Sequence, residues 1–291
     1  MQLFYLSLGF GLVTASVVAI ASLGLTLQFG VTNYVNFAYG DFLTLGAYFT
    51  WTFNAGLGWN FWLALAAGSL LVGLVALVIS QIVLEPFVRK GGPLLIILVV
   101  TFGLSLILSN SILAIWGADY KEYNVPLQSP ISIGPLVLTG YQLGIIALSL
   151  GVMALIHLTL TRTKLGKAMR AMSDDKSLAS VSGIPARPMT ALVWTVSGVL
   201  AGLGGGVLAL NVVTFDSSVG VTFLFVIFAA VIVGGIGKPY GAMLGALIIG
   251  MAVEISAVWI PSQYKLDVAF VILVLVLLVR PQGLLAVLGK A

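Results

Sequence analysis

Long apolar runs alternate with short polar or glycine-containing breaks along the whole chain. An α-helix needs about 20 apolar residues to cross a bilayer. The pattern predicts helices over residues 3–27, 41–56, 61–84, 93–116, 141–160, 189–212, 221–236, 241–258 and 266–280. Regions 28–55 and 221–257 carry interruptions typical of broken helices, so eight or nine crossings fit the sequence. We therefore predict an all-α fold, a polytopic integral membrane bundle that forms one transmembrane domain over residues 1–291.

The composition agrees with a membrane protein and excludes several kinds of chemistry. Hydrophobic residues make up 60% of the chain and charged residues 8%, whereas soluble domains carry about 25% charged residues. The chain has no cysteine and one histidine, His157, so thiolate chemistry and a histidine-based metal site are not expected. The residues after Lys167 and Lys238 do not complete a phosphate-binding G-x-x-x-x-G-K-[S/T] loop. We expect a chain that lies in a lipid bilayer, binds no metal, cofactor or nucleic acid, and is not an enzyme.

Lysine and arginine residues gather in the loops on one predicted side of the membrane. Eleven of the 13 lie on the side that carries residues 85–92 and 161–188, and the other two are Lys121 and Lys265. Cytoplasmic loops are enriched in Lys and Arg. The N-terminus is therefore predicted outside the membrane, with the C-terminus and loop 161–188 in the cytoplasm.

The stretch "NYVNFAYGDFLTLGAY" (33–48) places polar side chains where a lipid-facing helix would carry Leu and Val. A charge at the bilayer centre costs about 3 kcal/mol or more, so it normally faces a partner or a water-filled path. Either Asp41 caps a helix near the interface, or the stretch breaks a helix and lines a translocation path. Glu254 can equally be a structural residue, and Thr101 and Ser105, one turn apart, can bond between helices. The candidate pathway residues are Asn36, Tyr39, Asp41, Thr44, Thr101, Ser105 and Glu254.

A weak internal similarity joins "YGDFLTLGAY", which starts at Tyr39, to "YGAMLGALIIG", which starts at Tyr240. Glycine-interrupted apolar segments at corresponding positions of two halves are typical of inverted-repeat transporters, with the pathway at the repeat interface. The similarity predicts an inverted repeat in this chain.

The predicted cytoplasmic loop 161–188 contains the signals of a short, well-capped helix over 174–182. Ser173 suits the N-cap, where a hydroxyl accepts a free backbone N–H, and the two aspartates that follow favour the positive end of the helix dipole. Gly183 suits the left-handed C′ position, and the proline two residues later prevents continuation. The loop is either a solvated connector or a projection that docks on a cytoplasmic motor.

Three segments resemble one transporter family: "VNFAYGDFLTLGAY" (35–48), "LGKAMRAMSDDKSLASVSGI" (165–184) and "VIVGGIGKPYGAMLGALIIG" (231–250). The chain is similar to LivH-like permease subunits of the branched-chain amino acid ABC importers. The resemblance implies a bacterial cytoplasmic (inner) membrane importer of branched-chain or other neutral amino acids. It also implies a second LivM-like permease, two cytoplasmic ATP-binding subunits that bind ATP and Mg, and an extracytoplasmic solute-binding protein.

The same resemblance identifies the predicted loop as the element that contacts the ATP-binding subunits. The coupling residues expected on this basis are Arg170, Ser173, Asp174, Asp175, Ala179 and Gly183. Related permeases carry urea or short amides, which the sequence leaves open. Another alternative is a secondary transporter in which Asp41 and Glu254 bind protons or sodium. The capped loop argues against it, because a secondary transporter has no ATPase to dock. The absence of a catalytic motif argues against an intramembrane enzyme.

Overall fold

Helices dominate the computed structural model of the protein, which describes residues 2–89, 93–126, 128–134, 136–279 and 283. The long helices are α1 (Gln2–Thr32), α3 (Phe61–Ile79), α5 (Leu94–Trp116), α6 (Gly140–Arg162), α9 (Ala186–Val212) and α11 (Pro239–Ser256). The shorter ones are α2 (Tyr39–Trp51), α4 (Glu85–Arg89), α7 (Lys164–Asp174), α8 (Lys176–Val181), α10 (Val219–Gly234) and α12 (Lys265–Val279). Within the described residues, six helices are long and apolar enough to cross a membrane. The predicted all-α membrane bundle is confirmed as a fold class.

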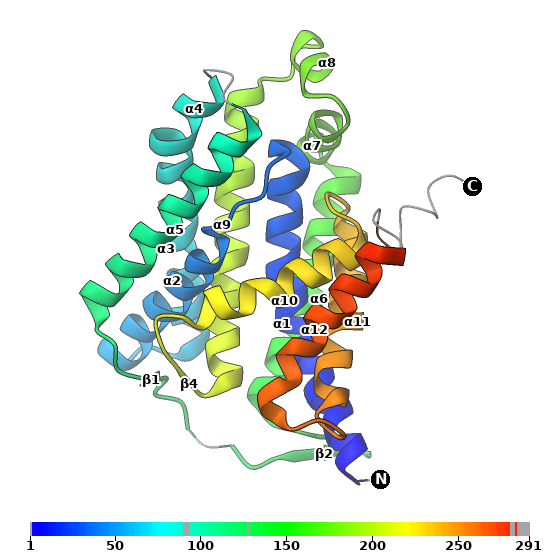
Figure 1. The fold of residues 1–291 in the computed structure, drawn as a ribbon. Helices are drawn as coiled ribbons and strands as arrows, with labels where there is room; N and C mark the ends of the chain where they lie inside the picture. The colour runs from blue at the N-terminus through cyan, green and yellow to red at the C-terminus, as the bar shows by residue number, and fades with distance from the viewer. Residues whose placement is uncertain (1, 90–92, 127, 135, 280–282, 284–291) are drawn as a thin grey trace.

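Two of the shorter apolar helices, α2 and α10, begin inside the bundle and not at either end (Figure 1). They have 13 and 16 residues, and at 1.5 Å per residue α2 is about 20 Å long, less than the hydrocarbon core of a bilayer. The segment 33–38 leads into α2 without regular structure. The break after α1 is therefore narrower than predicted, because the first helix continues beyond residue 27 to Thr32.

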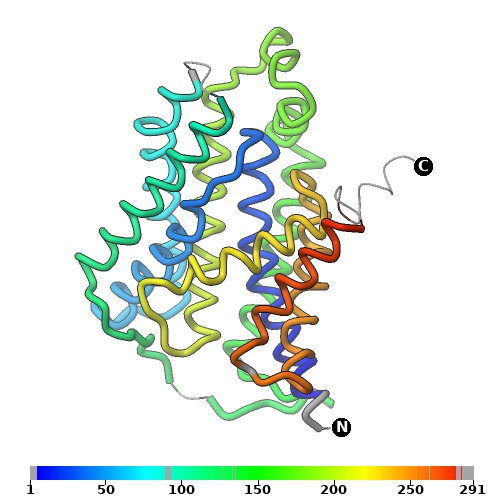
Figure 2. The backbone as a smooth tube through the Cα atoms, viewed as in Figure 1, coloured from blue at the N-terminus to red at the C-terminus, as the bar shows by residue number. Residues whose placement is uncertain are grey.

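The bundle has two distinct ends. Helices α4, α7 and α8 lie at one end, and the N-terminus lies at the other end with strands β1, β2 and β4 (Figure 1). Strand β1 (Lys121–Glu122) pairs with β4 (Thr214–Phe215), and β2 (Ile131–Ile133) pairs with β3 (Leu136–Leu138), both antiparallel. The path of the chain in Figure 2 shows long helices that run between these two ends. The predicted position of the C-terminus concerns residues 284–291, outside the described residues.

Glycine lets the inner helices pack backbone against backbone. A Cβ added at Gly205 of α9 would lie 1.8 Å from the Leu43 carbonyl oxygen of α2, and one added at Gly46 would lie 2.5 Å from Gly202. Small residues at helix interfaces allow this close approach in membranes, where van der Waals packing drives association. Helix α2 is thus fixed against α9 over most of its length.

Of the two Tyr-Gly steps, the first begins the short helix α2 and the second lies in the first turn of the long helix α11. The similarity between them therefore compares a helix that starts inside the bundle with one that starts at the α7–α8 end. Helix α10 resembles α2 more closely in position, because it also follows an irregular segment and also starts within the bundle (Figure 1).

Candidate translocation site

The carboxylate of Asp41 lies in the first turn of α2 and is completely buried. Its Oδ1 accepts a hydrogen bond of 2.8 Å from Ser109 Oγ, and its Oδ2 accepts one from Ser105 Oγ. Negative charge is favoured at the N-terminal end of a helix. The helix end and two neutral hydroxyls therefore hold this carboxylate, and no cation is paired with it among the described residues.

Both serines belong to α5, which presents hydroxyls at four-residue spacing. Thr101 precedes Ser105 by one turn and is buried, but its hydroxyl donates to the Leu98 carbonyl of its own helix at 2.9 Å. Ser109 was not among the residues predicted from the sequence. Its signal was the continued spacing 101, 105, 109, which puts the three side chains on one face of α5.

The N-terminal turns of α2 and α10 meet backbone to backbone. The backbone N–H of Gly220 donates to Thr44 Oγ1 at 3.1 Å, and that hydroxyl donates to the Gly40 carbonyl at 3.2 Å. A Cβ added at Gly220 would lie 2.1 Å from the Gly40 oxygen. Thr44 thus satisfies an otherwise free N–H at the start of α10, which the sequence did not reveal.

The irregular segment before α2 is covered by protein. Asn36 is buried, accepts the Ala38 N–H at 3.1 Å and donates to Gln28 Oε1 at 3.4 Å. The Tyr39 hydroxyl donates to the Ala21 carbonyl of α1 at 2.7 Å. Non-helical backbone at membrane depth is stable only where protein or water covers it. Asn36 and Tyr39 therefore support the break beside Asp41.

Glu254 lies apart from the Asp41 cluster, near the C-terminal end of α11. Its Oε1 accepts a hydrogen bond of 2.9 Å from Thr14 of α1 and pairs with Lys265 Nζ at 3.0 Å. The two predicted acids share none of these partners. The structure brings Asp41 together with Ser105 and directs the Thr44 hydroxyl to the start of α10, and it gives Glu254 a contact that joins α1, α11 and the start of α12.

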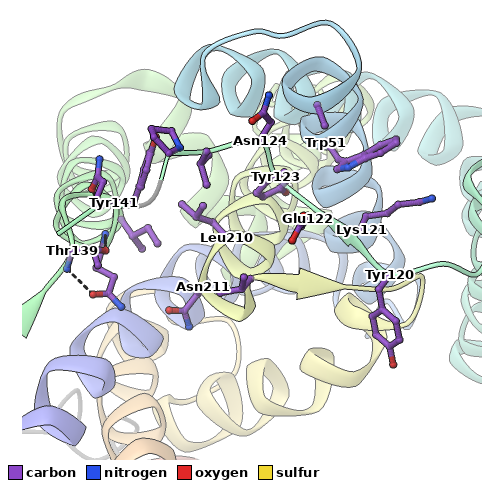
Figure 3. Close-up of a pocket in the computed structure, with 17 residues that line it drawn as sticks. Trp51, Tyr120, Lys121, Glu122, Tyr123, Asn124, Thr139, Tyr141, Leu210 and Asn211 are labelled. Carbon is purple, nitrogen blue, oxygen red and sulfur yellow. Dashed lines mark hydrogen bonds between the residues drawn. The ribbon is translucent and has the colours of Figure 1, made fainter. Parts of the chain in front are cut away.

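A cavity of about 850 Å³ opens at the end of the bundle that carries β1 and β4. Figure 3 shows Lys121 beside the Trp51 ring and Glu122 next to it on β1, with Leu210 and Asn211 of α9 across the cavity. The Lys121 ammonium lies 5.3 Å from the ring centroid, a cation–π distance. The cavity therefore offers both charge signs within apolar and aromatic walls.

The strand that borders this cavity is anchored by the neighbouring tyrosine. Burial raises the pKa of Tyr123 well above its usual value, so the phenol stays protonated. Its hydroxyl donates to the Ala47 carbonyl of α2 at 3.1 Å. The connection between α5 and α6 is thereby tied to the same helix that carries Asp41.

The other end of the bundle carries α7 and α8. The prediction that Ser173 is the N-cap of the short helix is wrong. Ser173 lies inside α7, which continues to Asp174 because Met172 is buried against the bundle. Asp175 is the N-cap of α8, and its Oδ1 accepts the N–H groups of Ser177 at 2.8 Å and Leu178 at 2.9 Å. The short helix predicted over 174–182 is therefore α8 over Lys176–Val181, and the extended residue Asp175 separates it from α7.

The predicted end of the short helix is confirmed. Gly183 has φ +86°, in the left-handed region. Its N–H bonds the Ser180 carbonyl at 3.1 Å, and the Ile184 N–H bonds the Ala179 carbonyl at 3.0 Å. These two bonds form a Schellman motif.

Helix α8 carries an apolar surface that the sequence reasoning missed. Leu178 is 65% exposed and Val181 is 88% exposed, and they lie three residues apart on one face. Ala179 is buried and therefore attaches α8 to the rest of the chain. Exposure of both large apolar side chains of so short a helix is a signal of an interaction surface.

Comparison with known proteins covers almost the whole chain. The sequence model of one family, described as "Branched-chain amino acid transport system / permease component", matches residues 7–279. The chain is 30% identical to the Pseudomonas aeruginosa high-affinity branched-chain amino acid transport system permease protein BraD, over 94% of this chain and 93% of that protein. No solved structure matches.

Two relatives from Escherichia coli share the description of high-affinity branched-chain amino acid transport system permease protein. The chain is 28% identical to its high-affinity branched-chain amino acid transport system permease protein LivH, over 94% of this chain and 93% of that protein. It is 26% identical to the permease protein LivM, over 91% of this chain and 67% of that protein. The resemblance noted from the sequence motifs is confirmed: this chain belongs to the family of permease components of the branched-chain amino acid transport systems.

Proposed function

We propose that this chain is the membrane permease subunit of an ABC importer and forms the translocation path for branched-chain or other neutral amino acids. The observation that carries the proposal is the family match over residues 7–279, together with relatives named as branched-chain amino acid permeases. No relative reported above is named for urea or amides, so the amino acid is the favoured substrate. ATP hydrolysis in partner subunits, which bind ATP and Mg, drives the transport.

The translocation path runs past the Asp41 carboxylate and the hydroxyl face of α5. Each carboxylate oxygen takes one serine hydrogen bond and retains a lone pair for the ammonium group of a passing amino acid. Thr101 extends this polar face by one turn. Asn36, Tyr39 and Thr44 hold the break and the start of α10 in position, and Glu254 acts as a structural brace.

The α7–α8 end faces the cytoplasm of a bacterium and the N-terminus lies outside. The support for this orientation is the excess of Lys and Arg in the loops of the α7–α8 end. The chain makes eight or nine crossings, with α2 and α10 as half-helices of an inverted repeat. In that repeat α1–α2–α3 corresponds to α9–α10–α11, and the junction of Gly40 with Gly220 is the midpoint between the two units.

Helix α8 docks on the cytoplasmic ATP-binding subunits through Leu178 and Val181. Asp175 and Gly183 fix its two ends, and Ala179 attaches it to the bundle. Arg170, Ser173 and Asp174 belong to α7, which connects α8 to the membrane helices. The full assembly contains a second, LivM-like permease, two ATP-binding subunits and a solute-binding protein at the end that carries the 850 Å³ cavity.

Transport by the reconstituted assembly tests this function. Proteoliposomes that contain both permeases, the ATP-binding subunits and the solute-binding protein are assayed for uptake of labelled leucine, alanine, glutamine and urea. We expect ATP-dependent uptake of leucine, and no uptake when the catalytic site of the ATP-binding subunits is inactivated. Uptake that follows a proton or sodium gradient without ATP would refute the proposal.

The docking surface is tested by the double variant Leu178→Ser/Val181→Ser. The change removes the apolar contact but leaves the caps of α8 intact, so the permease inserts normally and no longer co-purifies with the ATP-binding subunits. Lys164→Ala, an exposed change elsewhere on the same loop, is the control. Unchanged co-purification of the double variant would contradict the docking assignment.

A further inference from the structure

A second cavity, of about 470 Å³, lies at the α7–α8 end, away from the Asp41 cluster. Its walls come from the end of α1, the end of α6, α7 and the connection between α10 and α11. Helix α7 lies beside the upper end of α1 in both views (Figures 1 and 2). A Cβ added at Gly30 of α1 would lie 3.4 Å from Ser173 Oγ of α7, so the two helices are close at the cavity edge.

An unpaired hydroxyl lies in the wall of this cavity. Thr26 of α1 is completely buried, and its Oγ1 has no hydrogen-bond partner. Buried polar groups are nearly always hydrogen-bonded, because an unpaired one keeps its full desolvation cost. A ligand with a polar group in the cavity would satisfy this hydroxyl.

Charges of both signs surround the same cavity. Arg170 and Asp174 are four residues apart on α7 and share a face, and Lys238 comes from the α10–α11 connection. None of the three forms an ion pair with another described residue. A ligand with a carboxylate between Arg170 and Lys238 and an ammonium group beside Asp174 would pair all three charges.

The remaining walls suit an apolar side chain. Leu27, Val31, Leu160 and Met169 line the cavity, and the volume lies in the range of small-molecule sites. A phospholipid with the same pair of charged groups would need an opening for two long acyl chains. The volume and the apolar side chains favour a small zwitterion.

We propose that this cavity binds a neutral amino acid with an apolar side chain from the cytoplasm, as a regulatory site separate from the translocation path. The inference rests on the proposed function for the identity of the ligand. An occupied site holds α7 against α1, and α7 is joined to α8 only through Asp175. Binding therefore restrains α8 and lowers ATP hydrolysis when the cytoplasmic concentration of the transported amino acid is high. By thermodynamic reciprocity, the state with restrained α8 binds the amino acid more tightly.

Binding of tritiated leucine to the complete transporter tests the site. The permeases and ATP-binding subunits are placed in nanodiscs of phosphatidylcholine and phosphatidylglycerol, without solute-binding protein and without ATP. We expect saturable binding that Arg170→Ala and Asp174→Ala each weaken by about 10-fold or more, the loss of one hydrogen bond to a charged group. Thr26→Val keeps the shape of the side chain and should weaken binding by about 3-fold or more, the loss of one neutral hydrogen bond.

The matched control is Lys167→Ala, which removes a cation from α7 outside the cavity and should leave the leucine affinity unchanged. Leucine should also lower the ATPase rate of the wild type, and Thr26→Val should need about 3-fold more leucine or above for the same inhibition. Absence of saturable binding, or equal binding by all four variants and the wild type, would overturn the proposal. Leucine binding that disappears when phosphatidylethanolamine is added would assign the cavity to a lipid headgroup and overturn it as well.

Uptake by the same purified complex, reconstituted into proteoliposomes with solute-binding protein and ATP, separates this inference from the function on which it rests. If leucine is taken up but its binding does not depend on Arg170, the regulatory site alone is refuted. Failure to transport any neutral amino acid would refute the proposed function, and Arg170-dependent binding in that case would still support the cavity as an amino acid site.

Discussion

Asp41 and Glu254 are two acids in apolar helices with opposite surroundings. Asp41 is held by two serine hydroxyls at the start of the short helix α2, with no cation paired with it in the described part of the chain. Glu254 pairs with Lys265 at 3.0 Å and accepts a bond from Thr14. A carboxylate that keeps its negative charge uncompensated can attract a passing ammonium group, whereas one already paired contributes to packing. The difference leads us to expect that the partner, and not the acid itself, distinguishes a pathway residue from a structural brace.

Helices α2 and α10 meet at Gly220 and at Gly40, which is next to Asp41 in the sequence, and loss of this contact should have the largest effect. Gly220→Leu would place a side chain where even a Cβ lies 2.1 Å from the Gly40 oxygen. Helices α2 and α10 would separate, and we expect little folded protein in the membrane. The measurement is the yield of monodisperse permease in detergent. Gly151→Leu, at a glycine with nothing within 4 Å, is the control and should accumulate normally.

Removal of the isolated charge should reduce transport strongly and leave folding intact. Asp41→Asn keeps the size of the side chain and can still hydrogen-bond Ser105 and Ser109, but it loses the negative charge. Leucine uptake should fall by roughly 10- to 100-fold, the range expected when a hydrogen bond to a charged group is lost. Glu254→Gln, the same change at the other acid, should retain uptake within about 3-fold, as expected for one modest interaction. Equal loss in both variants would break the comparison.

The apolar pattern of the sequence predicted the helices well, because the length of a membrane span is imposed by the bilayer. The predicted ranges 93–116 and 189–212 lie close to α5 and α9 in the structure. Local capping was less predictable: Ser173 and Asp175 both suit an N-cap, and the burial of Met172 decides between them. That burial is a tertiary effect which no local pattern records.

The candidate site was predictable only in part, for a related reason. The sequence singled out Asp41 and Glu254 by residue type, but their partners are far away along the chain. Asp41 is separated from Ser109 by 68 residues, and Glu254 from Thr14 by 240. A single sequence does not reveal which distant segments meet. The four-residue spacing of hydroxyls on α5 was the one local signal that could have added Ser109.

The serine partners should have a smaller effect than the charge they hold. Ser109→Ala removes one hydrogen bond to Asp41 and leaves the other, and the carboxylate becomes less well oriented. We expect leucine uptake to fall by about 3- to 10-fold, and Ser105→Ala/Ser109→Ala to fall by more than either single change. Ser111→Ala, whose hydroxyl bonds the Ile107 carbonyl on the exposed side of the same helix, is the control. A single variant as inactive as Asp41→Asn would show that the serines do more than orient the carboxylate.

The brace at Glu254 should give the smallest effect, and on stability alone. Lys265→Met removes the cation of a pair whose side chains are 36% and 12% exposed. Partial exposure limits such a pair to about 1 kcal/mol or less, so we expect the melting transition of the detergent-solubilised permease to fall by about 2 to 4 °C. In Glu254→Gln/Lys265→Met no unpaired carboxylate is left, and the transition should return towards the wild type because the two residues are coupled. Leucine uptake should be unchanged in both variants. Loss of uptake that the double variant does not restore would assign Lys265 a role in the path and remove the distinction between the two acids.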